Sequence, residues 1–102
     1  MILICVVDDD ASVRNGLGNL LKSLGYHTVG FASGEEFLAS SASDEAHCVL
    51  LDLKMKGMQG LEVLERLKAA RKTVGVCCMS AHDDEVTVRR TREAGALGFL
   101  HK

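Results

Sequence analysis

Carboxylates, a hydroxyl and a lysine follow four separate apolar runs of this 102-residue chain. The acids are Asp8, Asp9 and Asp10 after ILICVV and Asp52 after HCVLL, and two later runs end in Ser80 and Lys102. An ionised aspartate at the end of a buried strand costs free energy unless a cation compensates it. These residue types therefore predict a site where acids and cations meet.

Several converging carboxylates raise one another's pKa values unless a divalent cation lies among them. Carboxylate oxygens with room for water are ligands that suit Mg²⁺. Lys102 adds a second positive charge, and the Ser80 hydroxyl can hydrogen-bond an anion. The combination predicts a phosphoryl site in which Asp52 is the nucleophile and becomes an aspartyl-phosphate.

Alternating strand and helix patterns must bring these residues together. Apolar runs of strand length occupy 2–7, 27–32, 47–52, 73–80 and 97–100. Helical spacing occupies 11–24, 34–41, 61–72 and 83–94, with a loop expected over 40–46. Five strands alternating with four helices predict a parallel α/β sheet with helices on both faces. Ligands of such sheets lie at the carboxyl ends of the strands, where the predicted site residues stand.

Local signals support these helices. Asp10 or Ser12 can cap the first one, and Ser33 with Glu36 forms a capping-box pattern before the second. The last helical segment, 83–94, has a thin apolar stripe, so we expect it to be loosely held.

Composition indicates one small globular domain. The chain is 47% hydrophobic and 25% charged with a formal net charge of -2, which argues against general nucleic-acid binding. No apolar run reaches membrane-spanning length and Met1 leads into no signal pattern, so we expect a cytoplasmic protein without membrane association. All cysteines lie in apolar strand-like runs without C-x-x-C spacing; we interpret them as reduced core residues, with a metal or disulfide role as the alternative: Cys5, Cys48, Cys77 and Cys78.

Four stretches together resemble a known family. VVDDDASVR, VLLDLKM followed by Gly60, MSA at 79–81 and GALGFLHK are similar, in order and spacing, to the receiver (CheY-like) domain of two-component response regulators. The resemblance covers essentially the whole chain and is closest to receivers that precede a helix-turn-helix DNA-binding domain. It implies a flavodoxin-like doubly wound sheet of five parallel strands in the order 2-1-3-4-5.

The resemblance also implies roles for individual residues. Asp52 would be the phosphoacceptor, Asp9 and Asp52 direct Mg²⁺ ligands with the Lys54 carbonyl, and Asp8 a ligand through water. Ser80 would be the switch hydroxyl, Lys102 the phosphoryl-binding lysine and Phe99 the aromatic that reports phosphorylation. A sensor histidine kinase would donate the phosphoryl group, and the face formed by 83–94 and 97–100 would switch. Such a domain signals and is not itself an enzyme.

Three departures from the family pattern qualify this interpretation. Lys56 stands where the family usually has proline, so the loop after Asp52 should be less rigid and a proline there should stabilise the protein. Lys54 and His82 stand where the family tunes hydrolysis of the acyl phosphate. The sequence stops at Lys102, before the usual fifth helix, which predicts a receiver domain over 1–102 with four of the usual five helices and an exposed apolar face that could form a homodimer.

Other interpretations remain open at this stage. Taken singly, the three aspartates at 8–10 are a solvated helix start, Ser80 a turn residue, Lys102 a frayed terminus and Phe99 a core residue. A phosphorylation-independent pseudo-receiver or dimerising interaction fragment is the main alternative function. A small Mg²⁺-dependent phosphohydrolase would use Asp8 or Asp10 as nucleophile, which the position of Asp52 argues against. DNA would be reached only through an output domain absent from this sequence.

Overall fold

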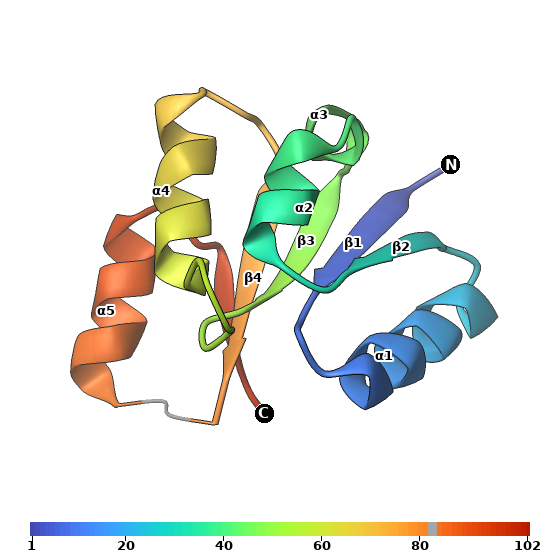
Figure 1. The fold of residues 1–102 in the computed structure, drawn as a ribbon, viewed down its shortest axis with the longest axis horizontal. Coiled ribbons are helices and arrows are strands. Elements are labelled where there is room, and N and C mark those ends of the chain that lie inside the picture. The colour runs from blue at the N-terminus through green and yellow to red at the C-terminus, as the bar shows by residue number, and fades with distance from the viewer. Residues whose placement is uncertain (82–83) are drawn as a thin grey trace.

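Five parallel strands form the single sheet of the computed structural model, which describes residues 1–81 and 84–102 (Figure 1). The strands are β1 (Leu3–Val7), β2 (His27–Phe31), β3 (Cys48–Asp52), β4 (Gly75–Ser80) and β5 (Gly98–His101). They run in the order β2-β1-β3-β4-β5, and every neighbouring pair is parallel. The predicted flavodoxin-like fold and strand order are confirmed.

The described residues contain five helical segments rather than the four expected. They are α1 (Ala11–Ser23), α2 (Gly34–Ala39), α3 (Ala42–Glu45), α4 (Gly60–Ala69) and α5 (Glu85–Glu93). The additional one, α3, lies in the segment predicted to be a loop, so that prediction was wrong. Ser40, which ends α2, stabilises the first turn of α3: its Oγ accepts the Ala42 N–H at 3.1 Å and its carbonyl accepts the Ser43 hydroxyl at 3.0 Å. Ala42 and Ser43 are buried, so packing stabilises a helix too short to form alone.

The main core lies between the sheet and α2 to α5, which share one side of the sheet, while α1 lies on the other (Figure 1). Inward residues of β1 and β3, such as Cys5, Val7, Val49 and Leu51, are fully buried there. Strands covered on both faces account for the continuous apolar runs of the sequence. This packing fixes the ends of β1 and β3, which carry the acidic residues.

The face that carries α1 is less completely covered. None of the α1 residues is buried, and Leu20 and Leu24 are 56% and 64% exposed. The main contacts of α1 are with β2 and β1. Leu100 on β5 is 49% exposed. Apolar surface therefore lies open beside α1. No described helix is long and apolar enough to cross a bilayer.

Polar caps begin the helices largely as the sequence predicts. The Asp10 carboxylate accepts the Ser12 N–H at 2.8 Å, and Ser33 Oγ accepts the Glu36 N–H at 3.1 Å. Asp84 caps α5, whose only buried residue is Thr91. The thin apolar stripe expected for this helix is confirmed, while its loose attachment stays a prediction.

Candidate functional site

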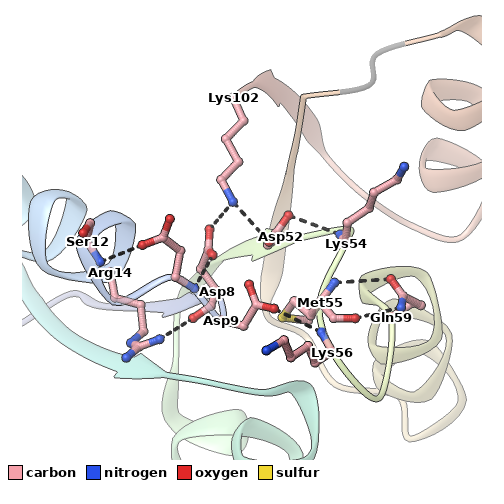
Figure 2. Close-up of polar contacts among 11 residues, drawn as sticks. Asp8, Asp9, Ser12, Arg14, Asp52, Lys54, Met55, Lys56, Gln59 and Lys102 are labelled. Carbon is pink, nitrogen blue, oxygen red and sulfur yellow. Dashed lines mark hydrogen bonds and ion pairs between the residues drawn. The ribbon is translucent and has the colours of Figure 1, made fainter.

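Three carboxylates meet at the carboxyl edge of the sheet (Figure 2). Because β1 and β3 are neighbouring parallel strands, the residues that follow or end them lie side by side. One ligand oxygen from each of Asp8, Asp9 and Asp52 lies within 4.8 Å of the others. Asp8 and Asp52 are buried, whereas Asp9 is exposed. Three of the four acids that follow the first and third predicted strands are therefore together, whereas Asp10 caps α1 and lies outside this group.

Lys102, which follows β5, brings its ammonium between two of these acids. Its Nζ lies 2.7 Å from Asp8 Oδ2 and donates a hydrogen bond to Asp52 Oδ2 at 3.1 Å. Its main-chain N–H donates to the Ser80 carbonyl at 2.8 Å, so β4 positions it. The contact with Asp8 is an ion pair that does not meet the geometry of a hydrogen bond. Asp8 Oδ2 is buried and has no hydrogen-bond donor among the described residues.

One oxygen of each carboxylate is held by a main-chain N–H. The donors are Asp10 to Asp8 Oδ1 at 2.9 Å, Lys56 to Asp9 Oδ2 at 3.1 Å and Lys54 to Asp52 Oδ1 at 3.2 Å. The β1–α1 turn and the β3–α4 loop therefore fix the acids. The other oxygens remain for Lys102 or for a ligand.

The negative charge of the three carboxylates exceeds the positive charge of the Lys102 ammonium beside them. Burial raises the pKa of Asp52 despite the opposing effects of Lys102 and the Lys54 N–H, and the Asp8 carboxylate adds to the rise. Burial alone would lower the pKa of Lys102, but Asp8 and Asp52 outweigh it and the pKa is raised. The Lys102 ammonium pairs with Asp8 and Asp52 of this three-carboxylate group, and Asp8 Oδ2 has no hydrogen-bond donor among the described residues. This set of hard oxygen atoms fits Mg²⁺.

The other predicted site residues lie on neighbouring elements. Ser80 is buried at the end of β4, one residue beyond Met79, the register partner of Asp52. With Lys54 it lines a cavity of about 370 Å³ that extends to α5. Phe99 is half-buried against the core on the α5 side. His82 lies outside the described residues.

Sequence reasoning missed two side chains that shape the site. Arg14 Nη1 donates to the Asp8 carbonyl at 2.7 Å and crosses Gly30, where an added Cβ would lie 3.4 Å from Arg14 Cδ. Gln59 bonds both main-chain groups of Met55 in the β3–α4 loop. Arg14 lies just after the acids of the first strand in sequence, and this proximity could have suggested a role at the site. No sequence signal points to Gln59.

A doubly wound α/β domain with an acid and lysine cluster at its carboxyl edge is the class that this fold and geometry define. The chain belongs to the response regulator receiver domain family, whose model matches residues 4–102. It is therefore a receiver domain of two-component response regulators, a signalling domain related to regulators that are phosphorylated on aspartate.

Individual relatives agree with this assignment. Nodulation protein W of Bradyrhizobium diazoefficiens is 33% identical over 100 residues, which cover 98% of this chain and 44% of that protein. Sporulation initiation phosphotransferase F of Bacillus subtilis is 33% identical over 99 residues, 97% of this chain and 80% of that protein. The Thermotoga maritima response regulator TrrA, solved in complex with Mg²⁺-BeF, has a TM-score of 0.87 at 29% identity and covers all of this chain and 87% of that one. The chain spans about half the length of several curated relatives that it matches.

Proposed function

We propose that Asp52 accepts a phosphoryl group from the phosphohistidine of a sensor histidine kinase. Mg²⁺ would be held directly by Asp9, Asp52 and the Lys54 carbonyl, and through water by Asp8. The observation that supports the proposal most is the hydrogen bond from Lys102 Nζ to Asp52 Oδ2 at 3.1 Å, since it joins a cation to a buried carboxylate. The solved relative with Mg²⁺-BeF supports the choice of metal. Bound Mg²⁺ would offset negative charge on the transferring phosphoryl oxygens.

The transfer needs few protein groups. An Asp52 oxygen attacks phosphorus, the phosphorus–nitrogen bond of the phosphohistidine breaks, and its electron pair stays on the imidazole nitrogen of the donor. The Lys102 ammonium then pairs with a phosphoryl oxygen, because the modified carboxylate has lost its own charge. Ser80, buried at the end of β4, donates its hydroxyl to another phosphoryl oxygen.

In this proposal, phosphorylation changes the conformation of the face formed by α5 and β5. Ser80 and α5 residues such as Thr91 line the same cavity, so displacement of Ser80 toward the phosphoryl group changes the support of α5. Phe99 lies half-buried behind α5 and follows this change as a rotamer switch. Lys54, Lys56 and His82 tune the lifetime of the acyl phosphate by controlling access of water.

The domain, residues 1–102, acts in this proposal as a cytoplasmic phosphorylation switch and not as an enzyme. Curated relatives about twice its length suggest that DNA is reached only through an output domain. The exposed Leu20, Leu24 and Leu100 favour a homodimer through the α1 side of the sheet. A concentration series in equilibrium sedimentation tests the dimer, and a monomer throughout would contradict it.

Intact mass after incubation with Mg²⁺ and acetyl phosphate tests the phosphoacceptor, with Asp52→Asn as the matched control. We expect the gain of one hydroxylamine-labile phosphoryl group, which the variant lacks. No gain in a protein that still binds Mg²⁺ would favour the pseudo-receiver, whose interactions would depend on the open apolar face. Phosphorylation of Asp52→Asn at another acid would contradict the assignment of the nucleophile.

A further inference from the structure

The main chain of Lys56 connects the β3–α4 loop to Asp9. Its N–H donates to Asp9 Oδ2 at 3.1 Å, between residues 47 positions apart in sequence. Asp9 is exposed, unlike Asp8 and Asp52, so surrounding side chains restrain it least. Within residues 1–81 and 84–102, this is the one hydrogen bond of the Asp9 carboxylate.

The loop that carries this donor is itself fixed. Gln59 Oε1 accepts the Met55 N–H at 3.3 Å, and Gln59 Nε2 donates to the Met55 carbonyl at 2.7 Å (Figure 2). The Met55 side chain is buried in the core. Because residue 55 is held at both main-chain groups and by its side chain, the next amide has a defined position.

The donor exists because residue 56 is not proline. The chain contains no proline at all, and proline would remove the N–H at this position. The ammonium of Lys56 is a separate feature, since the side chain is exposed and the hydrogen bond comes from the main chain. The two contributions of this residue can therefore be tested independently.

We propose that the main-chain amide of Lys56 is a positioning group that orients Asp9 for Mg²⁺, leaving Asp9 Oδ1 for the ion. This inference rests on the proposed function only in taking Asp9 as a metal ligand. Hydrogen bonds to ligating carboxylates commonly change metal affinity by about 10–100-fold when they are removed. The β3–α4 loop thereby sets how readily the site fills with metal, before any phosphoryl transfer.

Calorimetric Mg²⁺ titration of the unphosphorylated protein tests the proposal with Lys56→Pro and Lys56→Ala. Alanine keeps the amide and removes the ammonium, whereas proline removes both. We expect Lys56→Pro to bind Mg²⁺ about tenfold more weakly than Lys56→Ala. Equal affinities of the two folded variants would overturn the proposal.

An ester linkage between residues 55 and 56, with the lysine side chain retained, removes the N–H without the proline ring. It should weaken Mg²⁺ binding like Lys56→Pro and replaces that variant if proline prevents folding. In the metal-free protein, Asp9→Ala should speed hydrogen exchange of the Lys56 amide, and unchanged exchange would also overturn the proposal. Failure of Asp52 to accept phosphate would leave these affinities unaffected, so the two failures can be distinguished.

Discussion

Lys102 and Asp8, from opposite ends of the chain, meet with Nζ 2.7 Å from Oδ2. The Asp8 side chain is fully buried while the lysine side chain keeps 28% of its surface exposed. The same ammonium bonds Asp52, so one cation compensates two buried acids. A bound Mg²⁺ would share these oxygens with it.

Replacement of Lys102 should therefore separate metal binding from phosphorylation. We expect Lys102→Met to bind Mg²⁺ about tenfold more tightly, because a like charge next to the ion is removed. The metal-free variant should have a lower melting temperature, because buried acids lose their partner. Titration calorimetry measures the Mg²⁺ affinity and scanning calorimetry the melting temperature. Lys22→Met, in the last turn of α1, is the control. Mg²⁺ binding that is unchanged or weaker would contradict this prediction.

Gly60 should tolerate no side chain. A Cβ there would lie 2.4 Å from the Asp52 carbonyl oxygen and 2.7 Å from the Leu53 Cα, so alanine must push α4 away from the end of β3. We expect Gly60→Ala to lower the free energy of unfolding by about 1–3 kcal/mol and to slow phosphorylation.

Gly16 is the matched control for Gly60, because it lies inside α1 and a Cβ would meet nothing within 4 Å. Gly16→Ala should raise the free energy of unfolding by about 0.5–1 kcal/mol in urea titrations. If Gly60→Ala and Gly16→Ala changed the free energy of unfolding in the same direction, this explanation of the two glycines would be wrong.

The four free thiols should fall into two reactivity classes. Burial raises the pKa of Cys5 to about 11 and of Cys78 to about 12, and both side chains are inaccessible. Because the thiolate is the reactive form, alkylation at pH 8 should modify Cys48 and Cys77 first, since both are only half-buried. Peptide mass spectrometry after timed iodoacetamide treatment checks this order, and early labelling of Cys78 would exclude it.

Asp84 should stabilise α5 in a pH-dependent way. Hydrogen bonds from the Thr87 N–H and hydroxyl hold the pKa of this carboxyl below its ordinary value. A lowered folded-state pKa gives stability that is present above the unfolded-state value and is lost as pH falls through the folded-state value. Asp84→Ala should therefore lower the free energy of unfolding at pH 7. In urea titrations near pH 3, the wild type and the variant should differ less in this free energy. A constant difference would argue against the ionised cap.

Periodicity and turn residues in the sequence predicted the five strands and four of the five helices that the structure describes. Because ligands of parallel sheets lie at the carboxyl ends of the strands, the sequence also predicted that Asp8, Asp52 and Lys102 lie together. The short helix α3 was missed because hydrogen bonds of Ser40 and burial of Ala42 hold it, and neither leaves a periodic signal.

Main-chain donors were equally invisible in the sequence. Every residue except proline has a main-chain N–H, so the sequence does not mark the one of Lys56. Only the structure shows that Asp9 is its acceptor. This hydrogen bond also changes the expectation for Lys56→Pro. Proline would restrict the unfolded chain, which is stabilising, but it would also remove the charge-assisted hydrogen bond to Asp9. The stabilisation predicted from the sequence should therefore be reduced or reversed.

The separation of 50 residues between Asp52 and Lys102 has a consequence during synthesis. The acids leave the ribosome before their lysine, by roughly 2.5–10 s at common translation rates of about 5–20 residues per second. In that interval the nascent β1 and β3 would bring like charges together without the compensating ammonium. Under the proposed function, cellular Mg²⁺ bound to these acids would supply the missing positive charge while the chain is still being made.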